Sequence, residues 1–299
     1  MHLSPRADEV AAPVALDAAL LHSWPLPIDE HGDKTTRGTV LVIAGSTTTA
    51  GAALLAGVAA LRMGAGRLQI ATVAPIAMGL SIAIPEALVL PITVDDQNHL
   101  VAADAASTLA EPIARAQAIL VGPGMTDPAA VAVIVDAIAR HMAPDGVLVA
   151  DAAALAAIAT IERDIVDGLG GRLVLTPNRE ELQRLVDGLG LGRQDDQPGC
   201  AAERLGAVVT CFGEIASFDG RRWHAEPATP GLGTSGSGDV LAGLAAGAAA
   251  RCGDGAQAAC WGTYVHAVAG NRLSERLGTM SFIARELLDE VPHVLATLD

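Results

Sequence analysis

The sequence predicts an α/β fold in which helices cover both faces of a mostly parallel central sheet. From residue 39 onward, short apolar segments alternate with longer segments of helical pattern, an order typical of a parallel sheet. Of the residues, 51% are hydrophobic but 2% are aromatic, so Ala, Val, Leu and Ile must build the core. Several apolar segments run directly into loops rich in Gly, Ser and Thr.

The first half of the chain carries the parallel sheet. Residues 1–36 are expected to be an irregular lead-in with one short helix at 17–22. The strands expected after it are 39–44, 67–73, 87–90, 118–121, 147–150 and 173–175. The helices expected between them are 51–63, one beginning near 75, 129–141 and 178–186.

The pattern changes after residue 206. Short strands are expected at 207–211, 215–218 and 221–224, with Asp219-Gly220 as a hairpin turn. Helices are then expected at 238–252, 254–277 and 281–298, the last one bent or interrupted at Pro292. No repeat or linker divides the chain, so residues 1–299 are expected to form one domain.

Composition excludes several classes of protein. The formal net charge of −15 argues against a general nucleic-acid-binding role. Charged residues interrupt nearly every long apolar window, which argues against a membrane protein. The four cysteines show no paired spacing and no signal peptide precedes them, so we expect reduced thiols in the cytoplasm.

The run Thr234-Ser235-Gly236-Ser237-Gly238-Asp239 is the most informative motif. Its small residues let backbone amides converge on an anion, and the helix that begins there directs its positive end to the same place. Asp239 beside such an anion site suits a general base or a metal ligand. The alternative is an ordinary turn in which Asp239 caps the helix.

Other strands end in loops of similar character. These loops are 45–52, 122–125, Asp151 and 176–181. Since ligands of open α/β sheets collect at the carboxyl ends of strands, we expect a nucleotide-sized cleft there, although each loop alone fits an ordinary turn. The chain has no P-loop, no complete dinucleotide fingerprint and no nucleophile elbow. His266 lies in an apolar helix and is expected to be a core residue.

In order and spacing these motifs resemble the ribokinase-like superfamily, and within it the ADP/ATP-dependent (S)-NAD(P)H-hydrate dehydratases of the carbohydrate-kinase-domain family. The resemblance covers about residues 31–296. The segments that carry it are His31 and Lys34, 38–46, 51–53, 61–66, 122–124, 151–152, 176–181 and 235–243. It implies a three-layer αβα fold and an enzyme, a hydro-lyase that uses ADP or ATP to return hydrated NADH or NADPH to the intact cofactor.

The resemblance also implies the roles of individual residues. Asp239 is the catalytic residue that accepts the proton of the substrate hydroxyl, and Mg²⁺ accompanies the nucleotide, with no ligand assigned. The substrate contacts implied are Ala52, Gly124, Asn178 and Asp239. The nucleotide contacts implied are Phe212, Gly213, Glu214, Ile215, Ala216, Ser235, Gly236, Ser237 and Gly238.

Three positions depart from the family pattern. Ala153 stands where the family has Asp, Asn178 where it has a substrate-contacting His, and Phe212 where it has a Lys near the nucleotide phosphates. Two other functions therefore stay open: a ribokinase-like kinase that releases a stable phosphate ester, and a non-catalytic nucleotide-binding paralogue. The sequence does not choose between ADP and ATP, or between the two hydrated cofactors.

The predicted helices 238–252 and 254–277 are apolar on more than one face. The residues concerned are Leu241, Leu244, Cys260, Trp261, Tyr264, Val265, Val268 and Leu273. Together with the resemblance, this predicts a homo-oligomer, a tetramer, unless the sheet and neighbouring helices cover these faces. The length leaves no room for the hydrate epimerase domain of some family members, so we expect that activity in a separate protein.

Overall fold

The computed structural model describes residues 12–28, 36–96, 100–161, 166, 168–192 and 196–298. His31 and Lys34, which belong to the resemblance, lie outside the described residues.

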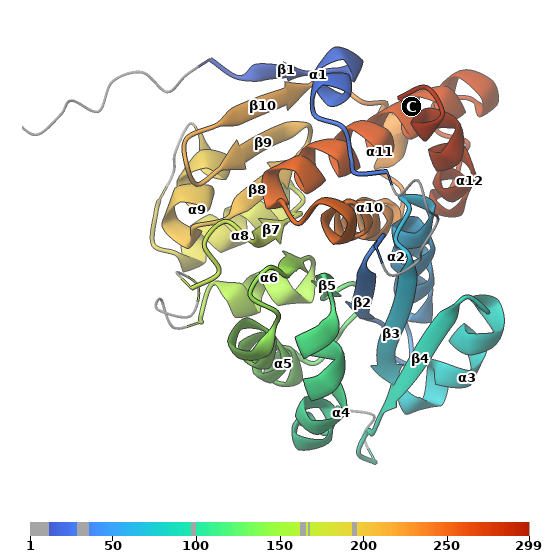
Figure 1. Cartoon of the computed structure of the whole chain (residues 1–299), viewed down its shortest axis with the longest axis vertical. Coiled ribbons are helices and arrows are strands. Elements are labelled where there is room, and N and C mark those ends of the chain that lie inside the picture. Colours follow the sequence, from blue (N-terminus) through green and yellow to red (C-terminus); the bar gives the residue numbers. More distant parts are fainter. Residues whose placement is uncertain are drawn as a thin grey trace, which may run out of the picture.

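A ten-stranded sheet runs through the described part of the chain, in the order β1-β10-β9-β8-β7-β6-β5-β2-β3-β4 (Figure 1). Neighbouring strands are parallel, except that β9 is antiparallel to both β8 and β10. The strands are β1 Val14–Leu16, β2 Thr39–Ile43, β3 Arg67–Val73, β4 Ala87–Ile92, β5 Ala118–Val121, β6 Val147–Ala150, β7 Leu173–Leu175, β8 Val208–Cys211, β9 Glu214–Ser217 and β10 Arg222–Ala225.

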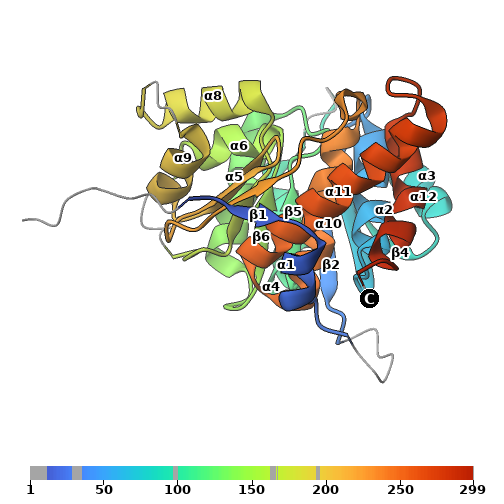
Figure 2. The same cartoon turned by 90° about the horizontal axis from the view of Figure 1, so that it is seen from above.

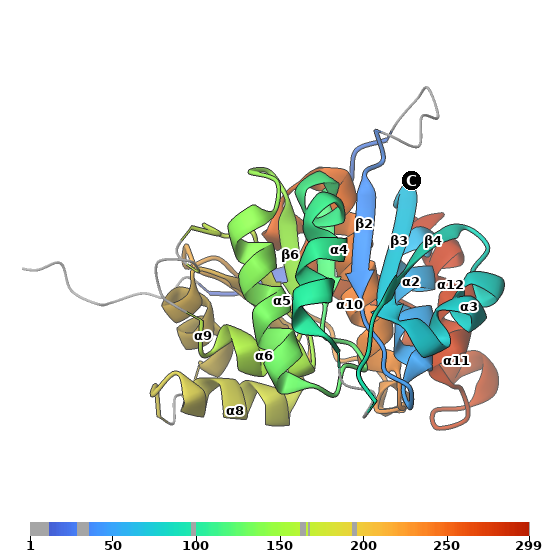
Figure 3. The ribbon, with the colours of Figure 1, turned by 90° about the horizontal axis from the view of Figure 1, so that it is seen from below.

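Helices cover both faces of this sheet, as its strand pattern requires. In β2, Val40 and Val42 face one core while Leu41 and Ile43 face the other, because successive side chains of a strand point to opposite faces. The first face is covered by α1 Ala18–Ser23, α2 Ala50–Arg62, α3 Ala74–Ala83, α10 Ser237–Cys252, α11 Gly255–Leu277 and α12 Ala284–Leu295 (Figure 2). The second is covered by α4 Ala102–Arg115, α5 Pro128–His141, α6 Ala153–Ile158, α8 Arg179–Gly188 and α9 Gln197–Leu205 (Figure 3).

The predicted three-layer αβα class is therefore confirmed, and most predicted elements lie within two residues of the observed ones. Five of the described elements were not predicted. They are β1, α4, α6, α9 and the 3₁₀ helix η1 Pro230–Leu232. Three-residue β1 pairs with β10, which is distant in sequence, and α9 begins with a Gln-Pro-Gly that resembles a turn. The predicted lead-in thus contains a strand as well as its helix.

Two predictions about the C-terminal helices need correction. Helix α12 continues through Pro292 to Leu295, so the predicted interruption is wrong. The apolar faces of α10 and α11 are covered by the sheet, α2 and α12. They therefore give no support to the prediction of a homo-oligomer.

Helix α10 lies at the centre of the first layer, between α2 and α11 and against β2, β5 and β6. Two of its glycines make this possible. A Cβ atom at Gly243 would lie 2.3 Å from the carbonyl oxygen of Ala56, and one at Gly247 would lie 2.5 Å from that of Ala60. The backbones of α10 and α2 therefore touch, which fixes α10 in position and directs its N-terminus to the carboxyl edge of the sheet.

We predict that Gly243→Ala destabilises the protein by roughly 1–3 kcal/mol, because the new methyl group must push α2 away. The matched control is Gly79→Ala on exposed α3, where a Cβ meets nothing within 4 Å. That change should stabilise by roughly 0.5–1 kcal/mol, because Ala favours helix more than Gly does. Urea unfolding of both variants is the measurement, and equal effects would contradict the contact.

Candidate functional site

The candidate site lies at the carboxyl edge of the parallel strands, where the strand order reverses between β2 and β5. From β2 the chain builds β3 and β4 on one side, and β5 to β8 on the other. At such a switch point the loops leave the sheet in opposite directions and open a crevice for ligands.

Two of the predicted loops meet at this switch point. The amide of Gly45 donates to the carbonyl of Pro123 at 2.8 Å, and the hydroxyl of Thr49 donates to the carbonyl of Gly124. Gly124 has a φ of +64°, and a Cβ there would lie 2.7 Å from the Cβ of Ala52. Ala52 and Gly124, which come from separate segments, are therefore direct neighbours, as a shared substrate surface requires.

The segment 234–239, called the anion loop from here on, leads into helix α10. Gly236, with a φ of +88°, is the N-cap residue, so the first amides of the helix have no partner within it. Asp239 is the third residue of the helix, and the alternative in which it caps the helix is wrong. Among the described residues its carboxylate has no hydrogen-bond partner. Burial, together with the charge of Glu181, raises the pKa of Asp239 to about 6.

A buried pair that the sequence did not reveal lies behind this loop. The hydroxyl of Ser237 and Nε2 of His266 are hydrogen-bonded at 2.9 Å. Burial lowers the pKa of His266 to about 4, so the imidazole is neutral at physiological pH. His266 is thus a core residue, as predicted, and it holds the Ser237 side chain in the interior.

Three carboxylates converge at the centre of the edge. Asp151, at the end of β6, accepts a hydrogen bond from the hydroxyl of Thr176 at 2.8 Å. Burial, together with the charges of Glu181 and Asp239, raises the pKa of Asp151 to about 7, although the hydrogen bond from Thr176 opposes the shift. The next residue, Ala152, has a φ of +46°, a strained value for a residue with a side chain. The site therefore concentrates negative charge in a poorly hydrated place.

Asn178 has a structural task in addition to the predicted contact with substrate. It is the N-cap of α8, and its Oδ1 accepts from the amide of Glu181 at 2.9 Å. In return, Oε2 of Glu181 accepts from the amide of Asn178 at 2.9 Å, which completes a capping box. The side-chain NH₂ of Asn178 stays available for a ligand.

The predicted nucleotide segment 212–216 divides into two parts. Phe212 and Gly213 form the turn of the β8–β9 hairpin, and Glu214 begins β9 with an exposed side chain. Ile215 and Ala216 lie inside the sheet, each 1% exposed, so that their side chains face the protein interior. The guanidinium of Arg179 lies over the Phe212 ring, with Cζ 4.4 Å from its centroid. Sequence reasoning missed Arg179.

No group of three His, Cys, Asp or Glu side chains forms a metal site within the described ranges. Mg²⁺ bound through the phosphates of a nucleotide commonly needs only one or two protein carboxylates. Asp239 follows the small residues at 234–238, and Glu181, in the first turn of α8, lies near enough for its charge to raise the pKa of Asp239.

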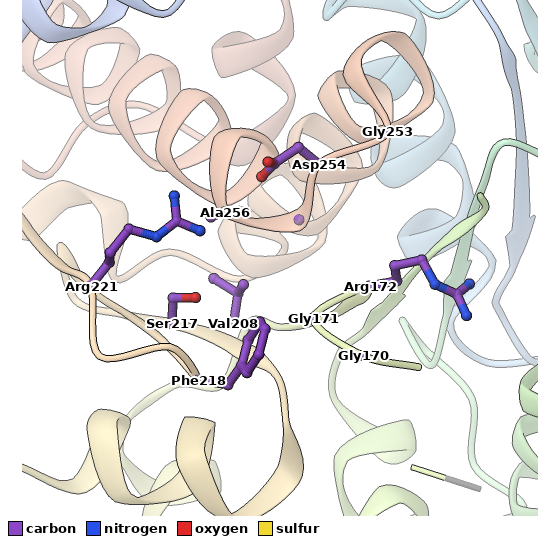
Figure 4. Close-up of a pocket in the computed structure, with 11 residues that line it drawn as sticks. Gly170, Gly171, Arg172, Val208, Ser217, Phe218, Arg221, Gly253, Asp254 and Ala256 are labelled. Atoms are coloured by element: carbon purple, nitrogen blue, oxygen red, sulfur yellow. The ribbon is translucent and has the colours of Figure 1, made fainter. Parts of the chain in front are cut away.

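The structure has one pocket close to the carboxyl edge of the sheet and another at the opposite end. One of about 310 Å³ lies between α6 and α8, beside Asp151. Its lining residues are Ala152, Ala153, Leu155, Ala156, Ala159, Glu181, Arg184 and Leu185. The other, of about 170 Å³, lies where β7 begins, at the opposite end of the sheet, and Figure 4 shows Phe218, Arg221 and Asp254 around it. It is separate from the site.

Comparison with known proteins agrees with the geometry. The sequence profile of the NAD(P)H-hydrate dehydratases matches residues 40–293. An ADP-dependent (S)-NAD(P)H-hydrate dehydratase of Xanthomonas campestris is 42% identical over 289 residues, 94% of this chain and 96% of that protein. A bifunctional NAD(P)H-hydrate repair enzyme of Moorella thermoacetica is 34% identical over 91% of this chain, which spans about half (52%) of that protein.

A solved structure shares the fold. The ADP/ATP-dependent NAD(P)H-hydrate dehydratase of Bacillus subtilis, co-crystallised with ATP/Mg²⁺, is similar to this chain with a TM-score of 0.78 and 26% identity. The similarity covers 96% of this chain and 99% of that one.

We predict that Asp151→Asn changes the dependence of stability on pH. The folded-state pKa of about 7 lies above the ordinary value of 3.8, so the contribution of Asp151 to stability is fully present below pH 3.8 and is lost as the pH rises through 7. Asn keeps the hydrogen bond from Thr176 and carries no charge. Between about pH 4 and pH 8, the unfolding free energy of the variant relative to wild type should rise by about 4 kcal/mol. Exposed Asp145→Asn is the control, and parallel curves would contradict the prediction.

Proposed function

Because the chain belongs to the NAD(P)H-hydrate dehydratase family, we propose that it uses ADP or ATP to dehydrate (S)-NADHX and (S)-NADPHX to NADH and NADPH. The observation that supports this most directly is the carboxylate of Asp239, which is partly buried at the N-terminus of α10 and has no hydrogen-bond partner among the residues that the structure describes. A base at an anion-binding loop is what phosphoryl transfer to a hydroxyl group requires.

In the first step, the hydroxyl oxygen of the hydrate attacks the terminal phosphorus of the nucleotide. Asp239 accepts the hydroxyl proton, the bond from this phosphorus to the bridging oxygen breaks, and AMP leaves from ADP, or ADP from ATP. The amides of Gly236 and Gly238 stabilise the charge on the transferred group, while the amide of Ser237 donates to the carbonyl of Thr234 at 3.2 Å. A pKa of about 6 suits this role, because Asp239 is ionised at neutral pH and still more basic than an ordinary carboxylate.

In the second step, phosphate leaves from the modified ring. The carbon–oxygen bond breaks, the neighbouring ring carbon loses a proton, and the new carbon–carbon double bond restores the dihydronicotinamide. Ala52, Gly124 and the NH₂ group of Asn178 contact the hydrate during both steps. Support for this arrangement comes from the direct contact between the loops of Ala52 and Gly124.

The nucleotide binds along 212–216 and 235–238, with its phosphates at the anion loop. Mg²⁺ supplies charge compensation to these phosphates when it is bound, and Asp239 and Glu181 are the carboxylates that would face it. Phe212, Gly213 and Glu214 offer the accessible part of the first segment.

One assay distinguishes the proposed function from its alternatives. The protein is incubated with NADHX, Mg²⁺ and either ADP or ATP, and the absorbance of NADH is followed. Recovery of NADH supports the dehydratase. A stable phosphorylated product from another alcohol would indicate a kinase instead, and nucleotide binding without turnover would indicate a non-catalytic paralogue.

We also propose a partner enzyme and a cellular location for this protein. The hydrated carbon is a stereocentre and the site is chiral, so we propose that a separate epimerase supplies the (S) form. A cytoplasmic location is supported by the four cysteines, which are all free thiols. In the part of the chain that the structure describes, no helix is long and apolar enough to cross a membrane.

We predict that Asp239→Asn lowers turnover by roughly 10²–10⁴-fold, because an amide does not accept the hydroxyl proton. The fold and the affinity for ADP should change little. In wild type, turnover should fall as the pH drops below about 6, since a protonated Asp239 is no base. The measurements are NADH recovery and calorimetric titration with ADP. Turnover close to wild type in the variant would exclude this role.

We also propose that the chain forms a homo-oligomer, a tetramer in which each subunit binds its own nucleotide. Exposed apolar side chains on α3 and edge strand β4 support this: Met78 is 77% exposed, Ile82 76% and Leu88 56%. Light scattering at micromolar concentration should give a multiple of the chain mass, and Met78→Glu should reduce it. Met280→Glu, at an equally exposed methionine elsewhere, is the control. A monomeric mass for wild type would refute assembly.

A further inference from the structure

The β8–β9 turn holds an aromatic residue, Phe212, with a strained backbone conformation and a side chain exposed to solvent. Phe212 has a φ of +51° and Gly213 one of +83°, so both central residues of the turn are left-handed. Asn, Asp and Gly are the residues that such two-residue turns favour. The Phe212 side chain is also 68% exposed. Strain of this kind at a candidate site is a reason to ask what the residue does there.

The Phe212 ring serves as a platform for a cation. Arg179, the first residue of α8, is exposed and lies with its Cζ 4.4 Å from the ring centroid. Within the described ranges, no carboxylate lies at ion-pair distance from this guanidinium. A guanidinium that stacks by its face keeps the N–H groups at its edge free to donate to two oxygens of a phosphate.

The surroundings require such a cation. The carboxyl groups of Asp151, Glu181 and Asp239 interact electrostatically with one another at this edge, and their charges repel a nucleotide with several phosphates. The charge of Arg179 acts at the adjoining end of β8. It lowers the pKa of Cys211, the last residue of that strand, against the larger effect of burial, which raises this pKa to about 11 overall.

We propose that Arg179, held on the face of Phe212, binds the phosphates of the nucleotide. This inference rests on the proposed function insofar as ADP or ATP binds along the β8–β9 turn. Arg179 is then a phosphate-binding residue, and Phe212 is a positioning residue that acts through it. This role explains why Phe stands in the strained turn, since Asn or Gly at position 212 would lack the aromatic face on which Arg179 stacks.

Arg179→Ala tests the binding residue. Its affinity for ADP in the presence of Mg²⁺ should fall about 10- to 100-fold, the range of a charge-assisted contact, while its affinity for adenosine stays within twofold of wild type. The control is Arg184→Ala on the same helix, where Nε donates to the carbonyl of Glu180. It should bind ADP within about twofold of wild type.

Two variants test the positioning residue. Phe212→Tyr keeps the aromatic face and should bind ADP as wild type does. Phe212→Asn relieves the strained turn and removes the platform, so the melting temperature should rise while the affinity for ADP falls. A merely structural role would move stability and affinity in the same direction.

The inference is overturned if folded Arg179→Ala binds ADP within twofold of wild type, or if Phe212→Asn does. This result can be told apart from failure of the proposed function. If only the inference about Arg179 is wrong, wild-type protein still recovers NADH from NADHX. If only the proposed function is wrong, wild-type protein recovers no NADH, but Arg179→Ala still loses affinity for ADP.

Discussion

The direct contact between the backbones of α10 and α2 is the constraint on which the rest of the structure depends. Gly243 and Gly247 meet the carbonyl oxygens of Ala56 and Ala60, so helix α10 lies in a single position between the sheet, α2 and α11. Ala52 lies in the first turn of α2, and α10 begins at the anion loop. One contact between small residues therefore sets the distance between the surface proposed for the hydrate and the loop proposed for the phosphates.

The electrostatics of the site follow from this geometry. Packing buries Asp151 and partly buries Asp239, and desolvation raises the pKa of each carboxyl group. The positive end of α10 and the amides at its start oppose that effect close to Asp239. Behind the loop, burial keeps His266 neutral, so it adds a hydrogen bond to Ser237 without adding charge. The basicity of Asp239 thus comes from the fold rather than from a single partner.

The sequence predicted what local pattern controls. Alternating apolar segments located the seven strands from β2 to β8, and the loops after them located Gly124, Asp151 and the anion loop at one edge. Some missed features had a signal. Ala105, Leu109 and Ile113 repeat every four residues along α4, and Asn178 followed by Glu181 has the spacing of a capping box. Others had none, because β1 and the Ser237–His266 pair depend on contacts between distant segments.

The structure shows that two of the departures from the family pattern, Phe212 and Asn178, are close to each other. Taken one at a time, Phe212 and Asn178 remove polar groups and suggest a weakened enzyme. In the structure, the two positions lie on adjoining loops, and the residue after Asn178 is the arginine that covers Phe212. Asn178 caps the helix whose first residue is Arg179, and the guanidinium of that arginine lies over the Phe212 ring. In the proposed arrangement, the positive charge that the family pattern has at position 212 comes instead from the first residue of α8.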